Sequence, residues 1–280
     1  MAKGAYAVYE IAKPSQGENA AEAAVEDLPV DKDAIVLVHG FNNNFDQVTA
    51  AYFQFEKRLL KLGFAGRVIG FTWPSYGKWF QYFGDVEQVE YAAFGFLNFL
   101  LAYRQRLGGR RLHLNAHSMG AHLVFHALAN YSAVDAIPAA GPGEILIGEL
   151  TLFAADVSGA SLEKNEDGRR AAGEARRLTS YFSGNDQVLG ISEIANHESR
   201  LGLEGAAHAA QLPSNAFQVD CTTLIYDHAG YRDEPEVMKD LVGVLAGKPP
   251  DQISTRREED NKNTFAVGPE EDEDDDAGIS

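Results

Sequence analysis

The stretch LHLNAHSMGAHLV at residues 112–124 combines a short apolar run, a turn with a serine at its apex and the start of an apolar helix. Its Ala116-x-Ser118-x-Gly120 core is a one-residue variant of the Gly-x-Ser-x-Gly turn, where a strand passes sharply into a helix and the serine backbone is strained. Strand and helix collide at such a turn unless the residues two before and two after the serine are small, as Ala116 and Gly120 are. The turn predicts Ser118 as a nucleophile and the Met119 amide, at the helix start, as an oxyanion donor.

Strand-like and helix-like segments alternate on both sides of this turn. Parallel strands that are covered on both faces read as continuous apolar runs. Such runs predict strands at 34–38, 67–73, 111–116, 149–155, 178–182 and 217–226, with a further strand at a sheet edge over 5–11. Helical patterns occur at 46–62, 86–107, 119–131 and 234–246. The alternation predicts an α/β fold, a doubly wound and mostly parallel sheet flanked by helices.

A nucleophilic serine needs a base within hydrogen-bond reach, and the base needs an acid that fixes its tautomer. His228 follows the last predicted strand and precedes the last predicted helix, so it is the favoured base. Asp186 lies in a Gly-Asn-Asp turn after the strand at 178–182 and is the favoured acid. Asp156, after the strand at 149–155, is the alternative acid and would otherwise organise a loop near the pocket.

Two further strand ends supply candidate pocket residues, because open α/β sheets bind ligands at the carboxyl ends of their strands. The strand at 34–38 runs into a His-Gly turn, after which the Phe41 amide is the predicted second oxyanion donor and Asn42 the residue that orients its loop. An aromatic segment follows the strand at 67–73. Its side chains either line a substrate pocket or pack against the next helix, and the pocket candidates are Trp73, Tyr76 and Trp79.

Five motifs in order resemble those of a bacterial α/β-hydrolase family that is catalogued as a domain of unknown function and is related to esterases and lipases. They are HGFNNNF at 39–45, FTWPSYG at 71–77, AHSMG at 116–120, SGND at 183–186 and HAGY at 228–231. The resemblance covers about residues 30–247. It implies an α/β-hydrolase fold with Ser118 as nucleophile, Asp186 as acid and His228 as base. Ala116 replaces the commoner glycine, and this exchange of one small residue for another leaves the nucleophile assignment standing.

The hypothesis is a serine hydrolase that cleaves a small carboxylic ester through a Ser-His-Asp triad and an acyl-enzyme intermediate. Thioester hydrolysis or acyl transfer would use the same triad, and a non-catalytic binding protein on this scaffold is a further alternative. No cofactor or metal is expected: His122 and His126 lie four residues apart, but the sequence lacks the glutamate of a His-Glu-x-x-His motif. The sequence makes no prediction of the oligomeric state.

Charge and hydropathy exclude several classes of protein. The 280 residues include 41 acidic and 24 basic side chains, a net charge of −17, which would repel a phosphate backbone and argues against a nucleic-acid partner. No apolar run is long enough to span a bilayer, and the start lacks the apolar region of a signal peptide, which predicts a cytoplasmic protein. Residues 251–280 hold 11 acidic and 3 basic residues. They are predicted to form a disordered acidic tail after a domain at 1–250, whose core spans about 30–247.

Overall fold

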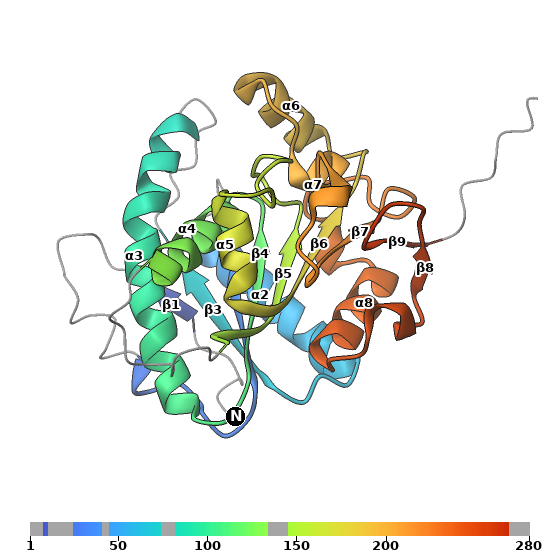
Figure 1. The fold of residues 1–280 in the computed structure, drawn as a ribbon. Coiled ribbons are helices and arrows are strands. Elements are labelled where there is room, and N and C mark those ends of the chain that lie inside the picture. The colour runs from blue at the N-terminus through green and yellow to red at the C-terminus, as the bar shows by residue number, and fades with distance from the viewer. Residues whose placement is uncertain (1–7, 11–24, 41–44, 74–81, 134–144, 269–280) are drawn as a thin grey trace, which may run out of the picture.

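The computed structural model describes residues 8–10, 25–40, 45–73, 82–133 and 145–268 (Figure 1). Within these ranges nine strands form one sheet in the order β1-β3-β2-β4-β5-β6-β7-β9-β8. The strands are β1 (Val8–Glu10), β2 (Ala34–Val38), β3 (Arg67–Thr72), β4 (Leu112–His117), β5 (Ile147–Phe153), β6 (Ala175–Phe182), β7 (Ala216–Asp220), β8 (Arg256–Glu258) and β9 (Thr264–Val267). Every neighbouring pair is parallel except β8 and β9. The predicted mostly parallel sheet is confirmed, and β1 lies at its edge as expected.

Helices cover both faces of the sheet (Figure 1). Helices α3 (Tyr82–Leu107), α4 (Gly120–Ala133) and α5 (Asp167–Gly173) pack side by side on one face, and α2 (Phe45–Lys61) and α8 (Pro235–Leu245) pack on the other. Helices α6 (Gln187–Asn196) and α7 (Leu201–Glu204) follow the carboxyl end of β6. The described ranges also contain three short 3₁₀ helices, η3 (Ala209–Gln211), η4 (Gly230–Arg232) and η5 (Pro250–Gln252). Among the helices of the described ranges, none is long and apolar enough to cross a membrane.

The alternation of side chains along β2 divides the interior into two hydrophobic cores. Successive residues of a strand point to opposite faces of the sheet. Ala34, Val36 and Val38 belong to the core under α3, α4 and α5, whereas Ile35 and Leu37 belong to the core under α2 and α8. All five are at most 2% exposed. The continuous apolar run predicted for this strand therefore reflects burial on both faces.

Strand β4 is apolar on one face only. Leu112, Leu114 and Ala116 join the core under α3 and α4, while the intervening side chains are His113, Asn115 and His117. Asn115 is paired in register with Leu37, so this polar row faces α2 and α8. Each polar side chain of the row has a hydrogen-bond partner. The sheet thus carries buried polar groups directly below the serine turn.

The domain extends past residue 250, so the predicted boundary is wrong. Strand β9 pairs in parallel with β7, and β8 pairs with β9. All four residues of β9 are buried, which gives this edge of the sheet an apolar strand that the acidic composition of 251–280 concealed. The strand predicted at 217–226 correspondingly ends at Asp220. The acidic run at 270–276 lies outside the described residues.

Candidate active site

Ser118 occupies a strained turn between β4 and α4. Its φ of 55° lies in the left-handed region, which costs a residue other than glycine about 1–3 kcal/mol and is tolerated where the surroundings fix it. The Ser118 amide donates to the Phe153 carbonyl at 3.0 Å, and the Ser118 carbonyl accepts from the Asp156 amide at 3.2 Å. The end of β5 therefore holds the serine in the conformation that the sequence predicted.

Two glycines allow the chain to pack closely around the serine. A Cβ atom on Gly120 would lie 2.6 Å from the His39 carbonyl oxygen, and one on Gly40 would lie 2.6 Å from Ser118 Cβ. Real Cβ atoms do not approach other heavy atoms this closely, so any larger residue would displace the backbone. The end of β2 is thereby packed against the serine turn.

His228 and Asp186 form a hydrogen-bonded pair. His228 Nδ1 lies 2.7 Å from Asp186 Oδ2. The other carboxylate oxygen of Asp186 accepts from the amides of Val188 at 3.1 Å and Leu189 at 3.0 Å, and so caps the N-terminus of α6. Asp186 is 1% exposed. The helix cap fixes the carboxylate, and the carboxylate fixes the orientation of the imidazole.

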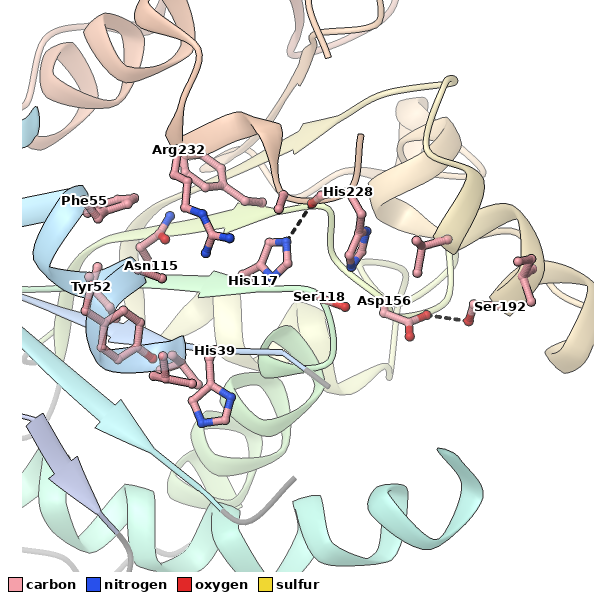
Figure 2. A pocket seen from close by; sticks show the side chains of 18 of the residues that line it. His39, Tyr52, Phe55, Asn115, His117, Ser118, Asp156, Ser192, His228 and Arg232 are labelled. Atoms are coloured by element: carbon pink, nitrogen blue, oxygen red, sulfur yellow. Dashed lines mark hydrogen bonds between the residues drawn. The ribbon is translucent and has the colours of Figure 1, made fainter. Parts of the chain in front are cut away.

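Ser118 and His228 line one cavity of about 520 Å³. Figure 2 shows the His228 ring close to Ser118 on the wall of this cavity. No hydrogen bond joins these two described side chains; in ligand-free enzymes such bonds are often long and tighten when substrate binds. The structure therefore brings the three predicted triad residues to one site, and the hydrogen bond between His228 and Asp186 is already formed.

The remaining walls of the cavity come from the sheet, α2 and α6. Most of the lining side chains are apolar, as expected of a site for a small molecule. The apolar lining residues are Leu37, Val38, Val48, Ala51, Tyr52, Phe55, Phe153, Val188, Ile191, Ala195 and Ala229. The polar ones besides Ser118 and His228 are His39, Asn115, His117, Asp156, Ser192 and Arg232.

Trp73 supports the loop after β2 and is absent from the described lining of the cavity, contrary to the prediction. Its ring stacks on His39 with centroids 5.5 Å apart, and its indole N–H donates to the His39 carbonyl at 2.9 Å. His39 Nδ1 donates to the Gly40 carbonyl at 2.8 Å, while His39 Nε2 accepts from the Trp73 amide at 3.1 Å. Burial lowers the pKa of His39 to about 4, which keeps the ring neutral as this bonding requires. This contact was not predicted, because the partner His39 follows a different strand, β2.

Asp156 lies on the cavity wall without serving as the triad acid. It accepts a hydrogen bond from Ser192 Oγ at 2.7 Å (Figure 2) and forms an ion pair with Arg200 at 3.6 Å. His228 uses Asp186 instead. The favoured assignment of the acid thus agrees with the geometry, and Asp156 joins the turn after β5 to α6.

His117 supports His228 from the β4 side. Its Nε2 donates to the His228 carbonyl at 2.8 Å, and the two rings lie 4.7 Å apart (Figure 2). Burial, with a smaller effect from neighbouring His228, holds the pKa of His117 well below its usual value. A neutral His117 anchors the loop that carries the base. Sequence reasoning missed this residue, although polar residues at every second position of an apolar strand mark a polar face.

The Met119 amide donates to no backbone carbonyl within the part of the chain that the structure describes. It follows Ser118 directly and precedes α4, so it is available to an oxyanion. The other predicted oxyanion and pocket residues lie outside the described residues: Phe41, Asn42, Tyr76 and Trp79.

Comparisons with known proteins give similar solved structures and one family. Solved structures similar to the chain include acyl-protein thioesterase 2 from Zea mays, with 16% identity over 78% of this chain and 94% of that chain and a TM-score of 0.46. Esterase B from Lactobacillus rhamnosis has 11% identity over 81% of this chain and 77% of that chain, with a TM-score of 0.42. Carboxylesterase CesB from Bacillus subtilis has 11% identity over 79% of this chain and 86% of that chain, with a TM-score of 0.40. The comparison with curated proteins finds no match. A family described as alpha/beta hydrolase of unknown function (DUF900) matches residues 17–244, and the chain belongs to that family.

Proposed function

We propose that the protein is a serine hydrolase that cleaves carboxylic esters through an acyl-enzyme intermediate. The observation that carries this proposal is the 2.7 Å bond from His228 Nδ1 to Asp186, in a cavity that the strained Ser118 also lines. This bond leaves His228 Nε2 as the nitrogen that can accept a proton. A Ser-His-Asp arrangement of this kind supplies the base, and the acid that orients it, which a serine hydroxyl needs.

In the first half of the reaction, Ser118 Oγ attacks the ester carbonyl carbon while His228 Nε2 takes the hydroxyl proton. The carbonyl oxygen becomes negative and accepts from the Met119 amide, with the Phe41 amide proposed as the second donor. The C–O bond to the alcohol then breaks, and His228 returns the proton to the departing oxygen. Asp186 stabilises the imidazolium that exists between these two proton transfers.

In the second half, water replaces the alcohol. His228 takes a proton from the water, whose oxygen attacks the acyl carbon on Ser118. When the bond to Ser118 Oγ breaks, His228 returns the proton to the serine and the carboxylic acid leaves. The chain supplies every group used in these steps.

The test is covalent labelling by a fluorophosphonate, which reacts with activated serines. We expect the wild type to be labelled, and Ser118→Ala and His228→Ala to lose labelling and the turnover of p-nitrophenyl butyrate. Ser118→Ala removes one oxygen atom, so its thermal unfolding should match the wild type. Labelling of Ser118→Ala at the wild-type rate would refute the assignment of the nucleophile.

A further inference from the structure

The cavity contains a cation that the proposed mechanism does not use. Of the described residues that line it, Arg232 is the only lysine or arginine. Figure 2 shows its side chain entering the cavity beside Asn115 and His117, on the side away from Asp156 and Ser192. Tyr52 and Phe55 of α2 line the same part, so the guanidinium lies among largely apolar walls.

The guanidinium of Arg232 has no hydrogen bond or ion pair to any described residue, and both the acid beside it in the chain and the acid bound to His228 are engaged elsewhere. Asp233, the next residue, pairs with Arg58, and Asp186 bonds to His228. Acidic residues outnumber basic ones by 41 to 24 in this chain, yet none of those that the structure describes supplies a partner here. An arginine that is partly buried without an anion gives up favourable interactions that its five N–H donors could make.

The backbone holds Arg232 in place although its side chain is unpaired. Arg58 Nη1 of α2 donates to the Arg232 carbonyl at 3.0 Å. The Asp233 amide donates to the Gly230 carbonyl at 2.8 Å, which closes the 3₁₀ turn η4. This turn begins two residues after His228. The catalytic base and the unpaired cation are therefore presented to the cavity by one short, anchored segment.

We infer that Arg232 binds a carboxylate on the acyl part of the substrate, so that the substrate class is a monoester of a dicarboxylic acid. This inference rests on the proposed ester hydrolysis. A guanidinium matches a carboxylate with two parallel hydrogen bonds. One guanidinium neutralises one charge, whereas a dianionic phosphate would leave a charge uncompensated between apolar walls. The acyl part stays bound to Ser118 after the alcohol leaves. It would therefore occupy the part of the cavity that is bounded by the sheet and α2, where Arg232 lies.

The spacing of residues along β4 gives an estimate of the length of the acyl chain. Asn115, which lies beside the guanidinium in Figure 2, precedes Ser118 by three residues. At the rise of a strand this corresponds to at most about 10 Å. An acyl chain of medium length, such as that of suberic acid, spans such a distance.

The kinetic test compares mono-p-nitrophenyl suberate with its methyl-capped diester, in which one added methyl group removes the charge. We expect the wild type to show a higher kcat/KM for the carboxylate-ended ester. Arg232→Gln should lower the ratio of the two kcat/KM values by about 10- to 100-fold, the range expected when a hydrogen bond to a charged group is lost. Arg170→Gln is the matched control, because it removes one positive charge from an exposed residue that pairs with Asp167 outside the cavity. This control should leave the ratio unchanged.

A binding test does not depend on turnover. In the Ser118→Ala background, calorimetry should show monomethyl suberate binding at least 10-fold more tightly than dimethyl suberate, and Arg232→Gln should abolish the difference. A wild type that hydrolyses the neutral ester through Ser118 but shows no carboxylate preference would overturn the inference and leave the proposed function intact. Carboxylate binding without any turnover would support the site and refute the ester hydrolysis. A preference for esters whose carboxylate lies in the alcohol part would also overturn the assignment.

Discussion

Asp186 and Asp240 are both buried carboxylates, at 1% and 0% exposed, but their partners differ in kind. Asp240, on α8, accepts two bonds from Arg256 at 2.7 and 2.8 Å, one from the Tyr181 hydroxyl at 2.6 Å and one from Thr255 at 2.8 Å. A guanidinium thus already balances its charge. This carboxylate joins β6, α8 and β8 and has no capacity left for chemistry.

Asp186 has no such cation. Within the described residues its partners are two backbone amides and His228. The amides satisfy one oxygen and orient the group, whereas the other oxygen faces the imidazole that gains a positive charge in the proposed mechanism. Asp186 therefore interacts most strongly with the state in which His228 holds the proton. In the proposed mechanism, a buried carboxylate with a permanent cation is structural, while one whose cation forms only transiently takes part in the chemistry.

The largest predicted effect follows from exchanging each aspartate for asparagine. Asp186→Asn keeps an oxygen for the α6 amides, since asparagine is an equally good cap, but presents an N–H to His228 Nδ1 and so favours the wrong tautomer. We expect kcat for p-nitrophenyl butyrate to fall by about 10⁴-fold with little loss of stability. Asp240→Asn is the matched control and should retain kcat per folded molecule. Comparable losses of kcat in both variants would break the comparison.

The next effect is on stability. Asp240→Ala leaves the Arg256 side chain, which is 1% exposed, without its counterion. Breaking a buried pair from one side costs about 3–5 kcal/mol, and urea unfolding should show this loss as a lower midpoint. Asp240→Ala combined with Arg256→Met should recover part of the loss, because no buried charge is then left unpaired. A double variant as unstable as the sum of the two single variants would show that the pair acts independently.

A finer effect tests how completely Asp240 is satisfied. Tyr181→Phe removes one of its neutral donors and leaves the bonds from Arg256 and Thr255. A hydrogen bond to a charged group contributes about 1.5–3 kcal/mol net. We expect that loss in urea unfolding and no change in turnover. A loss as large as that of Asp240→Ala would mean that the hydroxyl, and not the ion pair, dominates this cluster.

Local patterns predicted the parts of the fold that depend on neighbouring residues in the chain. The apolar runs located the strands, and the small residues around Ser118 predicted a turn that the φ of 55° confirms. Asp186 and His228 were predicted because each follows a strand in a parallel sheet, where all the reactive turns gather at one edge. The order of the strands did not have to be known for this step.

Features that depend on contacts across the sheet were missed. The cavity exists because β4 presents Asn115 and His117 toward α2, and nothing local to Arg232 shows that its side chain enters that space. The contact of Trp73 was missed for the same reason, since its partner His39 follows a neighbouring strand. The domain boundary predicted at residue 250 was wrong because it relied on the net charge of 251–280. That segment includes the apolar strand β9 and Arg256, which pairs with Asp240.

The smallest effect should come from removing residues 269–280. This segment contributes seven consecutive acidic side chains at 270–276, and it follows the last described strand, which ends at Val267. Its loss should change the free energy of unfolding by no more than about 0.5 kcal/mol, as for surface changes generally, and should leave kcat unchanged. Removing 251–280 instead deletes β8, β9 and Arg256. Asp240 would then be buried without its counterion. We therefore expect a stable, active protein from the first truncation and a protein destabilised at least as much as Asp240→Ala from the second. Equal stability of the two truncated proteins would show that residues 251–268 do not stabilise the domain. It would also contradict the structural role assigned to Asp240.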